Sequence, residues 1–171
     1  GRGGSIEETA LDDWNAMIAV NLTGTMLGCK HGLKTIVSTG GAGAIINMSS
    51  IAGLVGPSDI AGYCASKGGV TTLTKSVAMH CAEKKYPVRC VAIHPTYVDS
   101  EMLDPVAEVS GISRENLTAG MAKLVPMGRV ATPDDIANTV VFAASNKAAM
   151  ISGSLLIVDG AQLAGPPSAH F

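Results

Sequence analysis

Apolar residues change their spacing along this sequence, and the changes predict an alternation of helices and strands. Apolar positions at mostly helical spacing predict one or two helices over roughly residues 7–37, with Ser5 and Glu8 as helix-starting side chains. A turn-rich stretch follows, and a short apolar run at residues 44–48 then predicts a buried parallel strand. The chain thus opens with helix and then strand.

The middle of the chain repeats this order. Apolar residues recur at helical intervals over residues 63–85, which predicts a long, mostly covered helix. Residues 88–94 form another short apolar run, and Pro95 ends it because proline cannot donate a hydrogen bond to a continuing strand ladder. Residues 96–132 lack one clean period and mix Glu and Met with glycines and a proline, which is typical of an irregular helical loop.

The last part of the chain adds one more helix and one more strand. Thr132 is placed to cap a helix that has proline at its first position and acidic residues in its first turn, and that runs to about Ser145. A final apolar strand is predicted at residues 154–158. This alternation predicts an α/β fold in one domain, residues 1–171, with a parallel sheet and helices on its faces.

Composition excludes several classes of function. The chain has 171 residues, 47% hydrophobic and 15% charged, and can bury a sizeable core. A net charge of −2 gives no field to attract nucleic acid, and every apolar run is far shorter than the roughly 18 residues of a membrane span. Four irregularly spaced cysteines predict reduced, mostly buried thiols in a cytoplasmic protein. The histidines, His94 among them, lack metal-ligand spacing and are expected to be surface or satisfied core residues, so no metal is predicted.

Tyr63 and Lys67 are the first candidates for chemistry. Four residues apart on a predicted helix, they lie on one face and within reach of one another. A nearby ammonium favours the phenolate and lowers the tyrosine pKa from near 10, which makes a better general acid/base. Taken alone, this spacing is more often packing plus a solvated lysine than a catalytic pair.

A serine at the carboxyl end of the strand predicted at residues 44–48 changes the odds. Open parallel sheets place their ligand sites at that edge, so Ser50 can donate to a substrate oxygen while Tyr63 moves the proton. Its neighbour Ser49 is the alternative. The spacing to Tyr63 favours Ser50, and Ser49 is expected to cap the strand-end loop.

The segment Tyr63-Cys64-Ala65-Ser66-Lys67 resembles the Tyr-x-x-x-Lys motif of the short-chain dehydrogenase/reductase family, and Ser50 matches that family's catalytic serine. The resemblance spans nearly the whole chain. It implies that Tyr63 is the general acid/base, that Lys67 holds the cofactor ribose and tunes the tyrosine, and that Asn21 holds a proton-relay water. Without the family, Asn21 would be an ordinary polar helix residue.

A second matching segment implies cofactor contacts. Ile93-His94-Pro95-Thr96-Tyr97-Val98-Asp99-Ser100 resembles the family's Pro-Gly segment, whose backbone and hydroxyl hold the nicotinamide carboxamide. Thr96 stands where the family usually has glycine, which alters backbone freedom beside the nicotinamide. The cofactor is expected to be NAD, with NADP as the alternative. The implied cofactor-binding residues are Tyr63, Lys67, Pro95, Val98 and Ser100.

The start of the family fold has no counterpart in this sequence. The family begins with a strand, a Gly-rich turn and a helix that receive the cofactor pyrophosphate, and Gly1-Arg2-Gly3-Gly4 is too short to be that turn. The resemblance therefore implies a Rossmann-like doubly wound sheet whose N-terminal third, with the first four strands, is absent. A companion N-terminal segment is expected to supply the adenosine half of the cofactor site, and these 171 residues alone to bind the cofactor poorly.

The implied activity is hydride transfer between a nicotinamide cofactor and a secondary alcohol or ketone. An alicyclic alcohol is the expected substrate, because residues 86–95 resemble bacterial hydroxysteroid and cyclic-alcohol dehydrogenases. An apolar pocket wall is expected from Met102, Leu103, Val106, Val109 and Ile112. Two alternatives stay open: an epimerase or dehydratase on the same scaffold, and a catalytically silent fragment that acts as an oligomerisation or binding module. The long helices and the family resemblance imply a homo-oligomer, expected to be a homotetramer.

Overall fold

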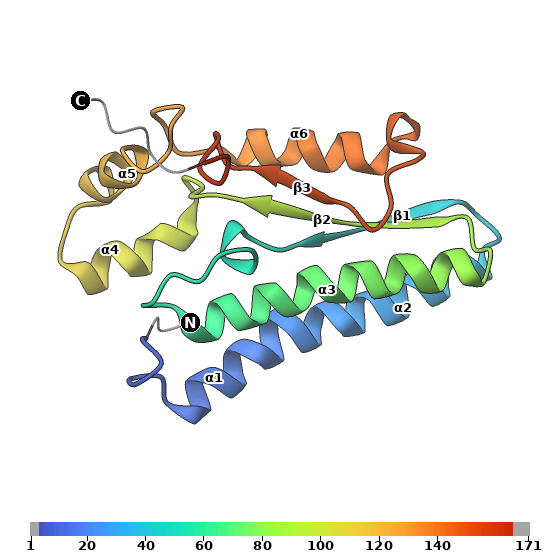
Figure 1. Ribbon diagram of the computed structural model, residues 1–171, viewed down its shortest axis with the longest axis horizontal. Coiled ribbons are helices and arrows are strands. Elements are labelled where there is room, and N and C mark those ends of the chain that lie inside the picture. Colours follow the sequence, from blue (N-terminus) through green and yellow to red (C-terminus); the bar gives the residue numbers. More distant parts are fainter. Residues whose placement is uncertain (1–3, 166–171) are drawn as a thin grey trace.

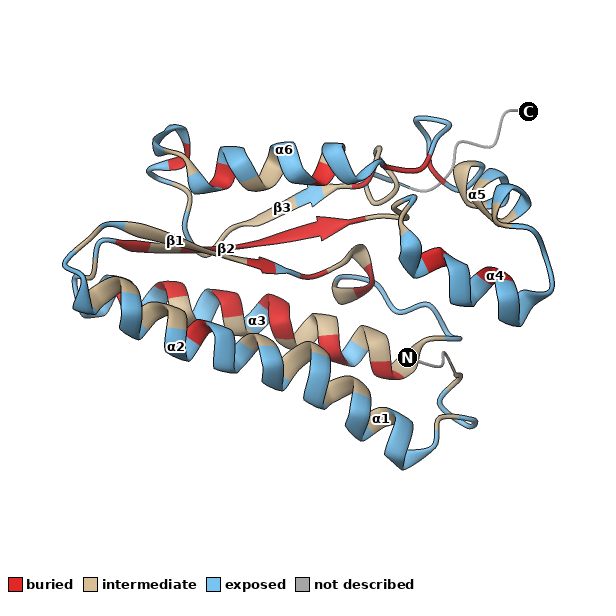
Figure 2. Ribbon diagram, turned by 180° about the vertical axis from the view of Figure 1, so that it is seen from behind, coloured by how far each residue is buried: buried red, intermediate tan, exposed pale blue. Residues whose placement is uncertain are grey.

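The computed structural model describes residues 4–165 and has an α/β fold built on a three-stranded parallel sheet. The strands are β1 (Gly43–Met48), β2 (Val88–Pro95) and β3 (Leu155–Val158), in the order β1-β2-β3. Gly43 of β1 pairs with Val88, and Pro95 of β2 pairs with Val158. The central strand β2 is the most deeply buried of the three (Figure 2). The predicted parallel α/β sheet is thus confirmed.

Helices cover both faces of this sheet. The N-terminal helices and the long helix α3 lie on one face, and α6 lies on the other (Figure 1). Their bounds are α1 Leu11–Met17, η1 Ile18–Thr23, α2 Gly24–Ser38, η2 Ile51–Gly53, α3 Ala61–Glu83, η3 Glu101–Leu103, α4 Asp104–Ser110, α5 Arg114–Ala122, α6 Pro133–Ala144 and η4 Asn146–Ala148. A parallel sheet with helices on both faces is part of a doubly wound, Rossmann-like fold.

The N-terminal helical region runs continuously from α1 to α2 but begins later than predicted. Ser5 and Glu8 close a separate turn instead, in which the Ser5 hydroxyl donates to the Glu8 carboxylate over 3.0 Å. Ala10 is extended, with φ −66° and ψ 145°, so α1 begins at Leu11. The expected start near residue 7 is therefore wrong by about one turn, because the capping pair serves the turn and not the helix. Residues 1–3 of the Gly-rich start lie outside the described range.

Strand β2 extends one residue further than predicted and includes Pro95. The next N–H, that of Thr96, donates to the Val158 carbonyl over 3.1 Å. In a parallel ladder the bonds to Val158 come from the residues that flank its pair, so the missing N–H of Pro95 costs no ladder bond. Beyond this strand, residues 96–132 hold only the short helices η3, α4 and α5, which confirms the expected irregular helical loop.

Helix α6 begins where the sequence predicts it. The Thr132 hydroxyl accepts from the Asp135 N–H over 3.2 Å, and the Asp135 carboxylate accepts from the Thr132 N–H over 2.8 Å, which completes a capping box. The Arg129 guanidinium lies 2.6 Å from the same carboxylate and is the main reason that the pKa of Asp135 is far below its usual range. Local bonds alone therefore fix the start of this helix.

The core is packed on both faces of β2. Ile93 packs with Ala131 and Ile136 on the α6 side. On α3, Val70 and Thr74 have no exposed surface. Within residues 4–165, no helix is both long enough and apolar enough to cross a membrane.

The outer edge of β1 has no strand partner within residues 4–165. A groove of about 520 Å³ lies between this strand and α2, and its lining includes Cys29, Ile36 and Ile45. Asn21 and Lys67 also line it. The unpaired edge of a sheet carries free N–H and C=O groups that can pair with a further strand.

Candidate active site

Three of the predicted site residues meet beyond the carboxyl ends of β1 and β2. Ser50 lies two residues beyond the end of β1 and is the residue before η2, whereas Tyr63 and Lys67 lie in the first turns of α3. The Lys67 Nζ lies 5.6 Å from the centroid of the Tyr63 ring. The Ser50 side chain interacts with the phenol closely enough to influence its pKa. The predicted one-face arrangement of Tyr63 and Lys67 is confirmed.

The pKa of Tyr63 does not follow the expectation drawn from its spacing to Lys67. Burial raises the pKa of Tyr63 above 10, and the interaction with the Ser50 hydroxyl offsets only part of this effect. The expected lowering is therefore wrong for the chain as it stands. The physical reason is desolvation, which disfavours the charged phenolate and which helical spacing does not reveal.

Lys67 connects the helix to the strand end. Its Nζ donates to the Met48 carbonyl over 3.0 Å, so the ammonium is held beside the last residue of β1. Burial lowers the pKa of Lys67. One carbonyl occupies only one of the three ammonium donors, which leaves Lys67 able to bind a further oxygen.

Of the two serines that follow β1, Ser50 and not Ser49 caps the loop at the strand end. Ser50 Oγ accepts from the Ala52 N–H over 3.1 Å and so caps the turn η2. Ser49 is buried and donates to the Lys67 carbonyl over 2.9 Å. The expectation that Ser49 caps the loop is therefore wrong, since Ser49 points toward α3.

A glycine allows η2 to lie directly against α3. A Cβ atom at Gly53 would lie 2.8 Å from the backbone carbon and oxygen of Lys67 and 2.8 Å from Ser49 Oγ. Backbone atoms of a helix cannot move aside as a flexible side chain can. Only glycine therefore permits this distance between the Ser50 turn and the helix that carries Tyr63.

Asn21 lies in a π-helical segment, η1, between α1 and α2. Its side-chain amide donates to Ser66 Oγ over 3.1 Å, and the Ser66 hydroxyl donates to the Tyr63 carbonyl over 2.8 Å. π-Helical turns are rare and occur frequently at functional sites. The structure thus links Asn21 to the Tyr63 helix through Ser66, a fully buried residue that sequence reasoning did not single out.

The segment after β2 presents backbone groups. Val98 forms a parallel bridge with Ala131, in which the Asp99 N–H donates to the Ala131 carbonyl and the Ala131 N–H donates to the Tyr97 carbonyl, each over 2.9 Å. Because these bonds come from the residues that flank Val98, its own N–H and C=O point away from the bridge. Within residues 4–165 no hydrogen bond uses them, and none uses the Ser100 hydroxyl.

Thr96, the departure from the family's glycine, does not strain the backbone. Its φ is not positive, so the left-handed freedom of glycine is not required at this position. Its hydroxyl donates to the side-chain amide oxygen of Gln162, and Pro95 before it is buried as the last residue of β2. The start of the segment that leads to Val98 is thus held by Pro95 in β2 and by the bond from Thr96 to Gln162.

His94 is a further residue of the site that the sequence did not identify. It is fully buried, and its Nδ1 lies 2.7 Å from the Ser50 carbonyl oxygen. Its Nε2 is buried and has no hydrogen-bond partner within residues 4–165. The expectation of a satisfied core residue is thus only half met. The sequence signal was present, since His94 lies next to the end of the strand that pairs with β1.

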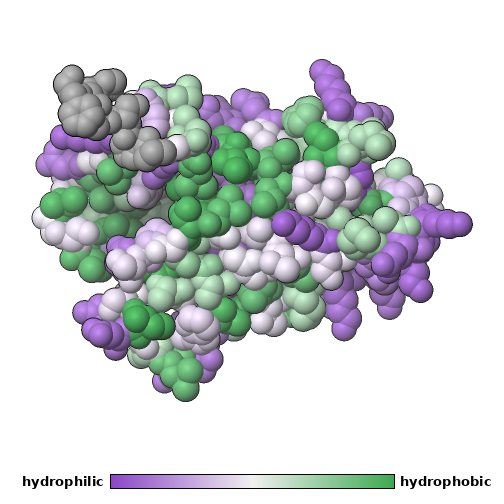
Figure 3. Space-filling model, in the orientation of Figure 1, coloured by the Kyte–Doolittle hydropathy of each residue, from purple (hydrophilic) through white to green (hydrophobic). Residues whose placement is uncertain are grey.

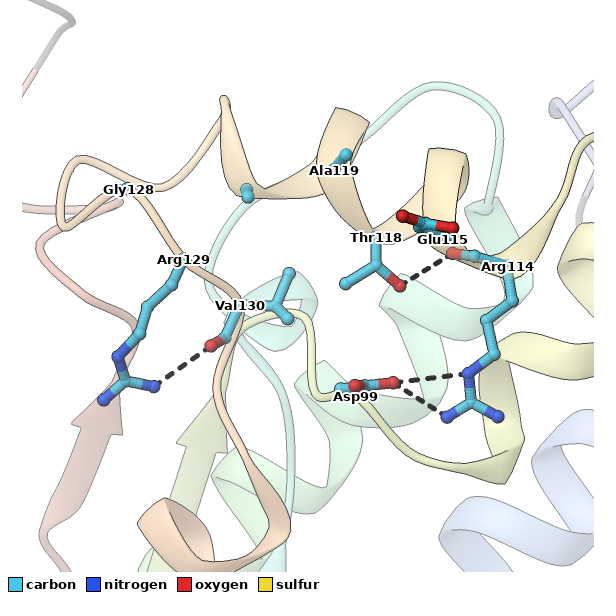
Figure 4. A pocket seen from close by; sticks show the side chains of 9 residues that line it. Asp99, Arg114, Glu115, Thr118, Ala119, Gly128, Arg129 and Val130 are labelled. Carbon is cyan, nitrogen blue, oxygen red and sulfur yellow. Dashed lines mark hydrogen bonds and ion pairs between the residues drawn. The ribbon is translucent and has the colours of Figure 1, made fainter.

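A second pocket, of about 560 Å³, lies under α5 and does not include Ser50, Tyr63 or Lys67. Figure 4 shows Arg114 reaching from α5 to Asp99, while the Arg129 side chain points away from it. Arg114 also pairs with Asp104, so its guanidinium is held by two carboxylates. This pocket lies beside the segment after β2.

Cysteines and metal-ligand geometry add little to the site. Cys29, Cys81 and Cys90 are buried free thiols and Cys64 is half-buried, in agreement with the expected reduced, mostly buried thiols. In the part of the chain from residue 4 to residue 165, no group of three or more His, Cys, Asp or Glu side chains is arranged to hold a metal ion.

Comparisons with known proteins agree on one family. The family model described as enoyl-(acyl carrier protein) reductase matches residues 2–161. The NADP-dependent (R)-specific alcohol dehydrogenase of Lentilactobacillus kefiri is 36% identical over 91% of this chain and 60% of its own. The cyclohexanol dehydrogenase of Acinetobacter sp. (strain SE19) is 37% identical over 94% of this chain and 59% of its own. The crystal structure of sorbitol-6-phosphate 2-dehydrogenase from Erwinia amylovora has a TM-score of 0.84 at 32% identity and is matched over 94% of this chain and 64% of its own.

These matches cover most of this chain but only part of each relative. The chain spans about three fifths of the length of the two dehydrogenases that it matches. The family model, in contrast, covers nearly all of this chain, and both dehydrogenases exceed 30% identity. The chain belongs to the short-chain dehydrogenase/reductase family.

Proposed function

We propose that this chain forms the catalytic part of an NAD(P)-dependent oxidoreductase that transfers a hydride between the nicotinamide and a secondary alcohol or ketone. The observation that carries the proposal is the meeting of Ser50, Tyr63 and Lys67 beyond the carboxyl ends of β1 and β2. Open parallel sheets bind their ligands at that edge. The two relatives described above are both named as dehydrogenases of alcohols.

Tyr63 is the general acid/base of this proposal. Its oxygen takes the hydroxyl proton during alcohol oxidation and returns it during ketone reduction. Because burial raises the pKa of Tyr63, a positive charge beside the phenol is needed to bring it into the working range. We assign that charge to Lys67, whose Nζ lies 5.6 Å from the centroid of the Tyr63 ring.

Ser50 stabilises the substrate oxygen. Its Oγ already accepts from the Ala52 N–H, so the hydroxyl proton is free to point toward a substrate. A donor aimed at an oxygen where negative charge develops lowers the barrier most when it is held in place beforehand. The turn η2 and its contact with α3 hold Ser50 in this way.

Asn21 is assigned to the water that relays the proton between Lys67 and solvent. Both residues line the groove beside β1. The bond from the Asn21 amide to Ser66 fixes its orientation relative to the helix of Tyr63. The π-helical turn of η1 supports this assignment, since such turns occur frequently at functional sites.

The residues after β2 fit a nicotinamide carboxamide. A primary amide has donors and an acceptor, which the neighbouring N–H and C=O of Val98 match in chemistry. The Ser100 hydroxyl offers a further partner, and buried Pro95 places this segment at the end of β2. Lys67 and Tyr63 are proposed to bind the ribose. When bound, the nicotinamide accepts or donates the hydride.

The cofactor is proposed to be NAD, with NADP as the alternative. The Lentilactobacillus kefiri relative is named as NADP-dependent, which favours the alternative. Parallel assays with both cofactors decide between them. A lower KM for one at equal kcat identifies the natural cofactor.

The substrate is proposed to be a neutral, alicyclic secondary alcohol. Met102, Val106 and Val109, in the irregular loop after β2, are exposed and offer an apolar surface. Arg114 is already held by two carboxylates and so is a poor partner for a charged substrate group. The relative named cyclohexanol dehydrogenase agrees with this choice.

Two partners complete the proposal. A companion N-terminal segment supplies a strand beside β1 and the adenosine half of the cofactor site, since that edge and its groove are open within residues 4–165. Further copies of this chain cover its exposed apolar surface, as in a homotetramer. Apolar surface extends across the middle of the view in Figure 3, and Val141, Phe142 and Ile157 of α6 and β3 are exposed.

The test is a direct absorbance assay of the complete gene product with cyclohexanol and each cofactor. Absorbance near 340 nm should rise as the cofactor is reduced. Turnover of substrate without net absorbance change would indicate an epimerase or dehydratase instead. No turnover of any alcohol or ketone by protein that is folded and binds cofactor would overturn the proposed function in favour of a silent module.

A further inference from the structure

His94 has no role in the chemistry proposed above, although it contacts Ser50 of the candidate active site. The side chain projects from β2 and has no exposed surface. Its Nδ1 lies 2.7 Å from the carbonyl oxygen of Ser50, the shortest hydrogen bond to the backbone of that residue. A fully buried histidine bonded to the backbone of a candidate catalytic residue calls for an explanation.

The geometry of this bond fixes the tautomer of the ring. A carbonyl oxygen can only accept, so Nδ1 must carry the proton and donate it. The Nε2 atom is buried without a hydrogen-bond partner within residues 4–165, which disfavours a second proton there because a buried unpaired N–H⁺ is costly. The ring is therefore neutral and acts as a single donor aimed at Ser50.

The same carbonyl oxygen is held from a second direction. The Gly53 N–H donates to it over 3.0 Å, closing η2. The Ser50 side chain is bound to the Ala52 N–H of the same turn. Ser50 itself is extended, with φ −164° and ψ 162°, so the chain changes direction immediately after it. Without the His94 donor, the peptide between Ser50 and Ile51 is fixed by η2 alone.

We propose that His94 is a positioning residue that fixes the Ser50 carbonyl to β2 and thereby aims the Ser50 hydroxyl at the substrate oxygen. The catalytic consequence of this inference rests on the proposed dehydrogenase function, whereas the structural role of His94 does not depend on that function. When the His94 side chain is replaced, the Ser50 carbonyl still accepts from the Gly53 N–H, so no buried acceptor is left without a partner. The replacement therefore changes the orientation of Ser50 more than the stability of the fold.

Three substitutions at one position separate this role from simple packing. In His94→Asn the amide Nδ2 stands where Nδ1 stood and can donate to Ser50, whereas His94→Leu keeps a similar branching without a donor. His94→Gln keeps an amide but places it where Nε2 was. His31→Leu, on the exposed surface of α2, is the control.

In the complete gene product, kcat should fall about 10- to 100-fold in His94→Leu and His94→Gln, while the KM for the cofactor stays unchanged. His94→Asn should restore kcat to near the original value, and His31→Leu should not change it. Equal loss in the Asn and Leu variants, or an unchanged kcat in the Leu variant, overturns the proposal.

A measurement that needs no activity separates this inference from the proposed function. Amide exchange of Ala52 and Gly53, whose N–H groups bind Ser50, should be faster in His94→Leu than in the original chain and unchanged in His94→Asn. If the original protein oxidises no alcohol but this pattern holds, the proposed function fails and the positioning role stands. Unchanged exchange in His94→Leu overturns the positioning role whatever the activity.

Discussion

At the scale of single residues, Tyr63 shows what spacing reveals and what it conceals. Four-residue spacing correctly predicted that Tyr63 and Lys67 share a helix face, because helical geometry depends on sequence separation alone. The sign of the Tyr63 pKa shift depends on burial, which spacing along the helix does not report. Ser49 and Ser50 show the same limit, since neither pattern nor spacing says which hydroxyl points into α3.

Removing the phenol oxygen tests the assigned role of Tyr63. Tyr63→Phe keeps the ring and its packing, and kcat of the complete gene product should fall by about 10²- to 10⁴-fold because the general acid/base is lost. Cofactor affinity, measured by fluorescence titration, should fall much less than kcat, because Lys67 still binds the ribose. Tyr86→Phe, which alters a tyrosine packed on His80 at the far end of α3, is the matched control. Near-original turnover by Tyr63→Phe would exclude Tyr63 as the proton donor.

The pKa of His94 predicts a pH dependence of stability. Burial is the main cause that lowers the pKa of His94 below 6.5, and the positive charges of Lys67 and Lys75 act in the same direction. The unfolded chain therefore binds a proton below about pH 6.5 that the folded chain resists, so this contribution to the free energy of unfolding is present above that pH and is lost as the pH falls toward the folded pKa.

Urea unfolding at about pH 7.5 and about pH 5 measures this loss. The original chain should lose more stability between these values than His94→Asn, which carries no titrating ring. Equal losses in the two proteins would show that His94 titrates normally and is not desolvated.

At the scale of secondary-structure elements, the strands and α6 were predictable and the details of the N-terminal helices were not. Short apolar runs ended by polar or proline residues mark β1 and β2 because burial on both faces demands continuous apolar sequence. The capping box of α6 is entirely local. The π-helical turn at η1 is different, since it changes backbone bonding without changing the apolar pattern, and Asn21 therefore read as an ordinary helix residue.

The contact of η2 with α3 can be tested with two glycines of one loop. Gly53→Ala would place a Cβ 2.8 Å from the Lys67 backbone, so the turn must move away from the helix, at a cost of about 1–3 kcal/mol of unfolding free energy. Gly56→Ala is the control, because nothing lies within 4 Å of its added Cβ and its φ is not positive. Urea unfolding compares the two variants, and equal stability of both would show that η2 is not held against α3.

At the scale of the whole molecule, the main open feature is the unpaired edge of β1 and the groove beside it. β2 has a strand on each side, whereas the edge strands β1 and β3 each have one neighbour within residues 4–165. The adjacent groove of about 520 Å³ is lined by apolar residues of α2 and β1 together with Asn21 and Lys67. A strand added here would therefore order the wall of the candidate active site as well as the sheet.

Amide exchange measures whether such a strand is added. A form that carries the proposed companion N-terminal segment should protect the β1 amides more strongly than the 171-residue chain does, because paired amides exchange only after the strand opens. β3, at the opposite edge, should exchange equally in both forms. The same longer form should bind the nicotinamide cofactor more tightly by calorimetry. Identical exchange of β1 in both forms would mean that the companion segment does not pair with this edge, and that the groove beside Asn21 and Lys67 stays open in the longer form.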